Sequence, residues 1–301
     1  MNTNQNSNNG SYGVSVFFPA LNDENSIAGL IAEAIEVALR VTDDYEVIVV
    51  NDGSSDGTAE VLNALASREP RLRVIHHQSN RGYGGALRSG FENATKDLIF
   101  YTDGDGQYDV REMAKLIPLM IEGVDVVNGY KIKRSDTRRR IALGAIYKFL
   151  ARLMFGLPIR DVDCDFRLMR REAIQSVSLT STSGVICTEM IYKLSRAGCR
   201  FAETPVHHYP RLHGQSQFFT LRRMAKTGCD FFRLWLKLVV FSNQSRAEIE
   251  SEKRGHQSEQ RQDDRANGLI DQRMPPLDRQ HDEERKHDAH VTSLAFERDS
   301  R

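Results

Sequence analysis

The sequence has few of the features that mark several common functional classes. It contains four cysteines in 301 residues, and none of them has the CxxC spacing of a zinc or redox site. Its 41 Lys and Arg residues are balanced by 41 Asp and Glu residues, so bulk positive charge does not support nucleic-acid binding. We therefore expect no disulfide scaffold, no zinc site, a reducing compartment and no nucleic-acid partner.

Long hydrophobic runs are also missing. No apolar stretch approaches the ~18–20 residues that a membrane-spanning helix needs. The chain begins with the polar stretch MNTNQNSNNG, which lacks the basic-then-apolar order of a signal peptide. We expect a cytoplasmic protein that is either soluble or peripheral on the inner face of the cell membrane.

Apolar side chains are scarce near the ends of the chain. Residues 243–301 contain 25 charged residues in 59, against eight large aliphatic, Met or aromatic side chains. A segment of this composition cannot bury enough apolar surface to offset the entropy lost on ordering. We predict a disordered N-terminus over residues 1–12 and a charged, mostly disordered tail over residues 243–301.

Between these ends, strand and helix patterns alternate. Short apolar runs predict strands over residues 14–18, 45–50, 72–76, 97–102 and 124–129. Helical periodicity predicts helices over residues 27–39, 58–67, 84–94 and 110–122. This order predicts an α/β fold with a mostly parallel central sheet and helices on both faces. Ligands of such sheets bind at the carboxyl ends of the strands.

Polar clusters follow three of the predicted strands: PALND at residues 19–23, NDGSSDGT at 51–58 and DGDGQYD at 103–109. In the last cluster a turn can direct the carboxylates of Asp103 and Asp105 to one side. Two carboxylates and the oxygens of a diphosphate suit a divalent cation such as Mg²⁺. The alternative is an ordinary surface turn, because Asp and Gly are common turn formers. The place of the cluster, directly after an apolar strand, favours a binding site.

These clusters, with NRGYGGALRSG at residues 80–90, resemble those of inverting family 2 glycosyltransferases of GT-A fold. Two later stretches, DVDCDFRLMR at 161–170 and TPVHHYPRLHGQS at 204–216, are similar to segments of dolichyl-phosphate mannose synthases and bacterial polyprenyl-phosphate relatives. The resemblance covers about residues 13–242. It implies a GT-A domain over residues 13–216 and an amphipathic, membrane-proximal or packing helix over residues 217–242.

The resemblance also implies roles for the matching positions. The nucleotide pocket comprises Pro19, Asp23, Asp52 and Asp103, with Asp52 against the nucleobase. Mg²⁺ or Mn²⁺ is held by Asp103, Asp105 and Gln107. The residues assigned to catalysis are Asp103, Asp105 and Arg211, and those assigned to the acceptor or to phosphate are Lys131, Arg140, Arg167, Arg211 and Ser216.

The chain departs from the family pattern at four positions. Asn51 and Asp23 stand where the family usually has Asp and Glu. Lys131 replaces an Arg, which keeps a positive charge but not a bidentate fork, and Gln217 replaces a Lys.

The choice of acceptor depends on the balance of cations and bases. A phosphate acceptor is already ionised and needs positioning, whereas a hydroxyl acceptor needs a general base. Residues 131–140 supply six cations in ten positions, which favours a polyprenyl phosphate, although such runs are also common in solvated loops. Asp161, Asp163, Asp165 and Glu189 are candidate bases for a hydroxyl acceptor.

Residues 141–155 and 217–241 have amphipathic helical patterns. Such helices either lie in a membrane interface or pack on the sheet, and the pattern leaves both open. The five histidines that stand near these motifs indicate structural roles or minor donor contacts and no metal site; they are His76, His77, His207, His208 and His213.

The leading hypothesis is an inverting, metal-dependent hexosyltransferase, similar to dolichyl-phosphate mannosyltransferases, that moves a mannose- or glucose-type sugar from a GDP- or UDP-hexose to a polyprenyl phosphate. A first alternative is an enzyme of the same fold that acts on a hydroxyl acceptor of a cell-wall or surface glycan. A second is a non-catalytic scaffold that binds nucleotide sugars.

Overall fold

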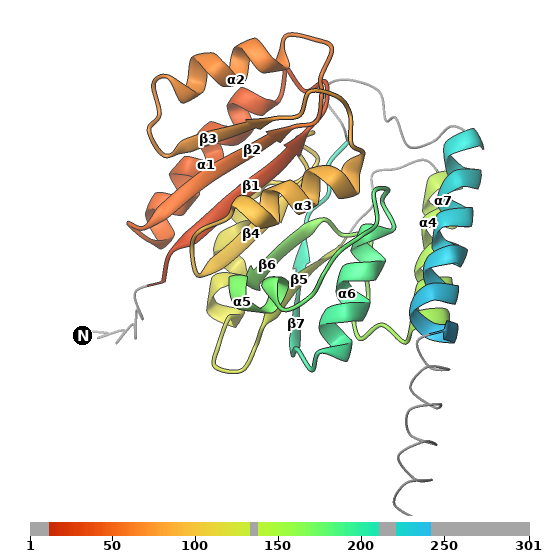
Figure 1. Cartoon of the computed structure of the whole chain (residues 1–301). Helices are drawn as coiled ribbons and strands as arrows, with labels where there is room; N and C mark the ends of the chain where they lie inside the picture. Colours follow the sequence, from red (N-terminus) through yellow and green to blue (C-terminus); the bar gives the residue numbers. More distant parts are fainter. Residues whose placement is uncertain (1–11, 133–137, 211–220, 242–301) are drawn as a thin grey trace, which may run out of the picture. The chain divides into compact units, whose positions relative to one another are not determined.

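The computed structural model describes residues 12–132, 138–210 and 221–241. In this part of the chain the strands form a seven-stranded sheet with the order β3-β2-β1-β4-β6-β5-β7 (Figure 1). The strands are β1 (Val14–Ala20), β2 (Tyr45–Asn51), β3 (Leu72–His76), β4 (Leu98–Thr102), β5 (Val126–Lys131), β6 (Phe166–Arg170) and β7 (Phe201–Val206).

The sheet is mixed, because β6 runs antiparallel to both of its neighbours, β4 and β5. The other pairs are parallel, so β1, β2 and β4 present their carboxyl ends at the same edge. Thr102, the last residue of β4, pairs with Phe166, the first residue of β6. This register places Asp165, which precedes β6, at the edge where Asp103 follows β4.

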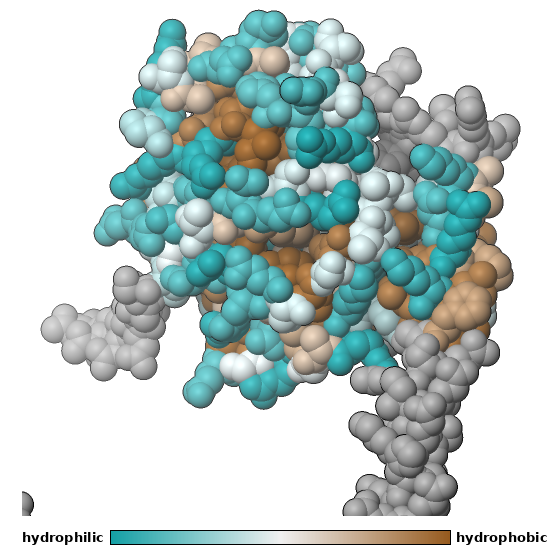
Figure 2. All heavy atoms as spheres, in the orientation of Figure 1, coloured by the Kyte–Doolittle hydropathy of each residue, from teal (hydrophilic) through white to brown (hydrophobic). Residues whose placement is uncertain are grey.

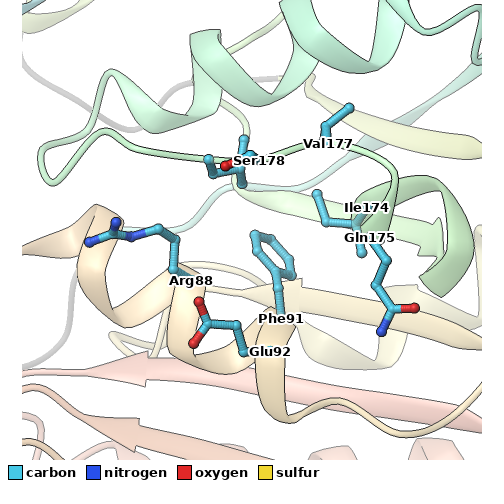
Figure 3. Close-up of a pocket in the computed structure, with 8 residues that line it drawn as sticks. Arg88, Phe91, Glu92, Ile174, Gln175, Val177 and Ser178 are labelled. Carbon is cyan, nitrogen blue, oxygen red and sulfur yellow. The ribbon is translucent and has the colours of Figure 1, made fainter.

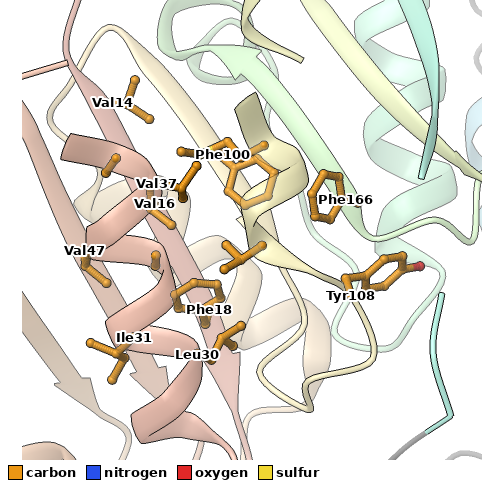
Figure 4. Close-up of a cluster of buried hydrophobic side chains, with 14 of the residues drawn as sticks. Val14, Val16, Phe18, Leu30, Ile31, Val37, Val47, Phe100, Tyr108 and Phe166 are labelled. Atoms are coloured by element: carbon orange, nitrogen blue, oxygen red, sulfur yellow. The ribbon is translucent and has the colours of Figure 1, made fainter. Parts of the chain in front are cut away.

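Helices cover both faces of the sheet, as the sequence predicts (Figure 1). Alternate side chains of β1 point to opposite faces, as the period of a strand requires. Val16 and Phe18 join a cluster that includes side chains of α1 (Ile27–Val41), as Figure 4 shows. Phe17 joins the cluster that includes α3 (Tyr83–Asn93) and α6 (Ile186–Arg196). The predicted helix over 58–67 is α2 (Thr58–Ala66), and the short helix α5 is Arg171–Gln175.

The sequence prediction of one helix over residues 110–122 is wrong. The structure has two short 3₁₀ helices there, η1 (Val110–Lys115) and η2 (Ile117–Leu119). Pro118 lies at the start of η2, and a proline cannot continue an α-helix because it lacks an N–H and its ring clashes with the preceding turn.

The helices α4 (Arg138–Phe155) and α7 (Leu221–Trp235) follow the amphipathic patterns, and α7 continues as the π-helix η3 (Leu236–Phe241). One side of each helix packs into the core, where Phe155 and Phe231 are buried. The Trp235 indole N–H donates to the Met154 carbonyl at 3.0 Å. Several apolar side chains of α4 remain exposed, and brown patches lie over these helices in Figure 2. No helix among the described residues is long and apolar enough to cross a bilayer.

Candidate active site

The loops that follow β1 and β2 are joined by hydrogen bonds. Asn22 has a left-handed backbone conformation (φ 59°), and its side-chain oxygen accepts from the Ser55 N–H at 2.8 Å. Its own N–H donates to the Ser54 hydroxyl at 3.0 Å, and the Asp23 N–H donates to the Thr58 hydroxyl at 3.0 Å. The two polar clusters therefore form one surface beside the ends of the strands.

The loop after β4 joins the same surface. The Ser26 hydroxyl donates to the Gly104 carbonyl at 3.2 Å. A Cβ on Gly104 would lie 2.7 Å from the carbonyl oxygen of Pro19, so only glycine fits between these strand ends. The convergence of the three polar clusters, which we predicted from the parallel pattern, is confirmed by these contacts.

Asp103 stands at the centre of a group of acidic residues. Burial raises the pKa of Asp103 well above its ordinary value, and the nearby carboxylates of Asp165 and Asp105 raise it further. The Tyr83 hydroxyl donates to Asp103 at 2.8 Å, and Lys131 also opposes the rise. A cation bound here would favour the ionised form of this carboxylate.

The acidic group suits a divalent cation that is shared with a substrate. No three His, Cys, Asp or Glu side chains in the described ranges are arranged to hold a metal by themselves. Mg²⁺ in proteins is commonly bound by one or two carboxylates together with substrate phosphates, so Asp103 and Asp105 fit this mode. The Gln107 N–H donates to Asp105 at 3.0 Å, which fixes the turn between them.

The segment after β7 is attached to this turn. The Tyr209 N–H donates to the Gln107 carbonyl at 2.8 Å, and the Gln107 side chain donates back to the Tyr209 carbonyl at 3.2 Å. Nearby, the His207 ring contacts Glu112 at 2.6 Å. These bonds bring the chain that leads to Arg211 against the acidic turn.

Asp52 is buried at the end of β2. Its Oδ1 contacts the His77 ring nitrogen Nδ1 at 2.6 Å and accepts from the Arg81 N–H at 2.8 Å. The other ring nitrogen of His77 lies 2.9 Å from the Ser89 hydroxyl. Asp52 thus connects β2, the end of β3 and α3.

Two predicted acceptor residues have contrasting surroundings. Lys131 is partly exposed and its ammonium donates to the Asp163 carbonyl at 2.6 Å. The Arg167 side chain is fully buried and donates to Tyr101, Asn128 and Asp165 and to the Val162 carbonyl. Burial leaves the Arg167 guanidinium no surface for direct contact with an acceptor.

Several predicted site residues lie outside the described part. The predicted site residues Arg211 and Ser216 fall within residues 211–220, as do His213 and Gln217, which were not assigned to the site. Arg140 is described only as part of the backbone of α4. The predicted disordered ends also fall outside it, apart from Tyr12.

Sequence reasoning missed three polar residues that the fold brings to Asp103 and its neighbours. Tyr83 reaches Asp103 from α3, and the Cys187 thiol contacts Asp165 at 3.0 Å from α6. Asp165 stood among the candidate bases but was not assigned to the site. Its place depends on the pairing of β6 with β4, which the apolar patterns did not reveal.

Glu189, another candidate base, has a structural role instead. Its carboxylate is fully buried and accepts from the N–H groups of Thr180 and Ser181 and from Lys193. These donors lower the pKa of Glu189 although burial opposes them. The carboxylate therefore holds the loop before α6 and has no free position for a substrate.

A separate hollow lies between α3 and the segment after α5 (Figure 3). It has a volume of about 380 Å³, and Arg88, Phe91 and Ile174 are among its lining residues. None of the predicted site residues lines it, so it is distinct from the acidic site at the strand ends.

Comparison with known proteins shows the family to which the sequence is related. The family model for glycosyl transferase family 2 matches residues 15–178. The glycosyltransferase AglD of Haloferax volcanii is 31% identical over 236 residues, covering 75% of this chain and 38% of the relative. Undecaprenyl-phosphate 4-deoxy-4-formamido-L-arabinose transferase of Yersinia enterocolitica is 30% identical over 211 residues, covering 69% and 63%. The chain thus spans less than two thirds of the length of either relative.

Among solved structures, glucosyl-3-phosphoglycerate synthase from Mycobacterium tuberculosis has a similar fold. A complex of that enzyme with Mn²⁺, UDP and glucosyl-3-phosphoglycerate superposes with a TM-score of 0.58 at 21% identity, over 75% of this chain and 79% of that one. A complex with Mg²⁺ and UDP gives a TM-score of 0.56 at 20% identity, with the same coverage. At this identity the likeness concerns the arrangement of strands and helices.

Proposed function

This chain belongs to glycosyl transferase family 2 and has the GT-A fold, and we propose that it transfers a hexose, of mannose or glucose type, from a nucleotide sugar to a polyprenyl phosphate with inversion at the anomeric carbon. The observation that carries the proposal is the crowding of Asp103 by Asp105 and Asp165 at the carboxyl edge of the sheet. Crowded carboxylates of this kind are suited to bind a cation together with a diphosphate.

Asp103 and Asp105 are proposed to hold Mg²⁺ or Mn²⁺, with Gln107 beside them. When bound, the ion supplies positive charge that stabilises the leaving nucleoside diphosphate. Tyr83 keeps Asp103 in place through its 2.8 Å hydrogen bond. The positive charge of Lys131 lowers the pKa of Asp103, so Lys131 adds a second positive charge near the proposed ion.

The proposed nucleotide pocket comprises Pro19, Asp23 and Asp52. Pro19 lies in β1, Asp23 lies in the loop that follows it, and Asp52 directly follows β2. Asp52 is proposed to accept a hydrogen bond from the nucleobase, since its Oδ2 has no hydrogen bond from the described residues. Recognition of the nucleobase by Asp52 would then select a GDP- or UDP-hexose as the donor.

The acceptor phosphate is proposed to meet Lys131, Arg140, Arg211 and Ser216. The attachment of Tyr209 to Gln107 supports this arrangement, because Arg211 follows two residues later. Arg167 is proposed as a positioning residue, since it is buried and holds Asp165 and Tyr101 at the site.

A polyprenyl acceptor requires access to a membrane surface. Six large apolar side chains among the described residues of α4 are exposed, and the three most exposed are Ile146 (56%), Phe149 (65%) and Leu153 (69%). Three basic residues, 138–140, begin this helix. We therefore propose that α4 makes peripheral contact with the cytoplasmic face of the cell membrane.

The test is a transfer assay on the full chain with radiolabelled GDP- and UDP-hexoses, Mg²⁺ or Mn²⁺ and a short polyprenyl phosphate. Label that enters the organic phase only with lipid and metal present would support the proposal. Metal-dependent nucleotide release that ignores the lipid would instead favour a hydroxyl acceptor. The site offers a candidate base for that reaction, because Asp165 is partly exposed beside Asp103.

A further inference from the structure

A buried polar chain links Asp52 to the interior of the domain. His77 connects the Asp52 carboxylate to the Ser89 hydroxyl, with ring contacts of 2.6 Å and 2.9 Å. The exposed fractions of the three residues are 3% for Asp52, 6% for His77 and 9% for Ser89. The order Asp–His–Ser is that of a hydrolytic triad, but Ser89 lies within the helix α3 and not in the loops at the carboxyl edge of the sheet.

The contacts determine which nitrogen of His77 carries a proton. An ionised carboxylate only accepts hydrogen bonds, so Nδ1 must donate to Asp52. The Arg81 N–H donates to the same oxygen, Oδ1, at 2.8 Å. Two donors on Oδ1 fix the rotation of the carboxyl group and leave Oδ2 as the oxygen that can accept from a ligand.

We propose that His77 is a positioning residue for donor recognition: it holds the Asp52 carboxylate so that Oδ2 can accept an N–H of the nucleobase. The inference rests on the proposed nucleotide pocket and extends it to a residue that never touches the donor. Uracil and guanine both carry a ring N–H that can donate to such an oxygen, whereas the corresponding ring nitrogens of cytosine and adenine accept.

Two variants of His77 separate positioning from structural support. The side-chain nitrogen of Asn can take the place of Nδ1, so His77→Asn keeps the bond to Asp52 and loses the bond to Ser89. His77→Gln can reach Ser89 in place of Nε2 and loses the bond to Asp52. Both replace a buried ring by an amide and should destabilise the fold to a similar degree.

The experiment measures UDP and GDP affinity by calorimetry and donor KM and kcat, using the full chain with Mg²⁺ or Mn²⁺. His77→Gln is expected to weaken nucleotide binding by about tenfold and raise KM, with kcat within about threefold of wild type. His77→Asn should weaken binding by no more than about threefold. Equal affinities for the two variants, at equal melting temperatures, would overturn the inference.

Asp52→Asn distinguishes failure of the inference from failure of the proposed pocket. If Asp52→Asn leaves UDP and GDP affinity unchanged, the nucleotide pocket is misassigned, and the proposed role of His77 is excluded as well. If Asp52→Asn weakens binding but the two His77 variants bind alike, only the inference fails. Should the His77 variants not fold, ¹⁵N NMR of the wild type decides: the inference requires a protonated Nδ1 on His77 whose signal moves when UDP binds.

Discussion

At the scale of single residues, the surroundings of Asp103 oppose its own negative charge. Burial and the carboxylates of Asp165 and Asp105 all favour the protonated form, while Tyr83 and Lys131 favour the ionised form. A carboxylate in such a place contributes little to folding by itself. Its proposed role is to bind a cation together with a substrate.

Asp105→Asn is expected to lower metal-dependent transfer by on the order of 100-fold, because one of the two charged ligands of the cation is lost. Asp109→Asn is the matched control, since Asp109 lies in the same loop but accepts from Arg111. The measurement is kcat for transfer at saturating donor, with a titration of Mn²⁺ for each variant. Equal losses in the two variants would remove Asp105 from the metal site.

Glu46 gives a prediction for stability rather than activity. It is buried, and although burial raises its pKa, hydrogen bonds from Ser15, Thr95 and Arg73 lower the pKa overall. Because folding lowers this pKa, the stabilisation is present above the ordinary value of 4.5 and is lost as the pH falls through the folded value.

Glu46→Gln should therefore lower the free energy of unfolding at pH 7 by about 1–3 kcal/mol, and the difference from wild type should shrink below pH 4.5. Urea unfolding at several pH values measures it. Glu60→Gln, at an exposed position in the first turn of α2, should change stability by less than about 1 kcal/mol. A difference that grows in acid would contradict the sign of the pKa shift.

How well single residues could be predicted depends on how local their contacts are. Asp103 and Asp105 could be found because they directly follow an apolar strand and share one turn. Tyr83 could not, and Asp165 could be named only as a candidate base and not as a neighbour of Asp103, because each reaches the site from a different element of the fold. Arg167 could be singled out by resemblance, but its burial depends on Tyr101 and Asn128, which lie on two other strands.

At the scale of elements, long periodic patterns were the most informative. The helices α1, α2 and α3 begin and end within two residues of their predicted bounds. The antiparallel strand β6 was not predicted, because DCDFRLMR has charged and apolar residues in an order that gives no clear period. Its neighbours β4 and β5 bury it on both sides, and this tertiary pairing decides its structure.

The exposed side of α4 leads to a prediction for membrane contact. Phe149→Asp replaces a side chain that is 65% exposed, and it should reduce binding to anionic lipid vesicles by more than about tenfold. Leu39→Asp is the control, because Leu39 is 52% exposed on α1, whose buried side chains belong to the other core cluster. Co-sedimentation with vesicles measures binding, and melting temperatures should differ little from wild type. Equal vesicle binding by the two variants would exclude α4 as the contact.

At the scale of the whole molecule, the mixed sheet brings the acidic turn, Asp52 and the segment after β7 to one edge. The α/β class follows from the alternation of patterns in the sequence, and the GT-A fold was implied by the resemblance of the motifs at the strand ends to those of a known family. The strand order does not follow from either, because β5 and β7 are joined to the rest only through β6. Long-range pairing of this kind leaves no local pattern to read.

The proposed shared binding of metal and diphosphate predicts a cooperative effect on stability. Asp103 and Asp105 offer too few ligands to hold a divalent cation tightly alone, and a diphosphate without the cation meets their negative charge. UDP and Mn²⁺ together should therefore raise the melting temperature more than the sum of their separate effects. When the ligand concentration is 100 times Kd, the free energy of unfolding rises by about 2.7 kcal/mol, which corresponds to several degrees of melting temperature for a domain of this size.

Calorimetric scans of wild type and Asp105→Asn measure this effect. The variant should lose the extra shift, while its melting temperature in the absence of ligands should equal that of wild type. Additive shifts in the wild type would mean that metal and nucleotide bind at separate places, and the acidic turn would then need another ligand.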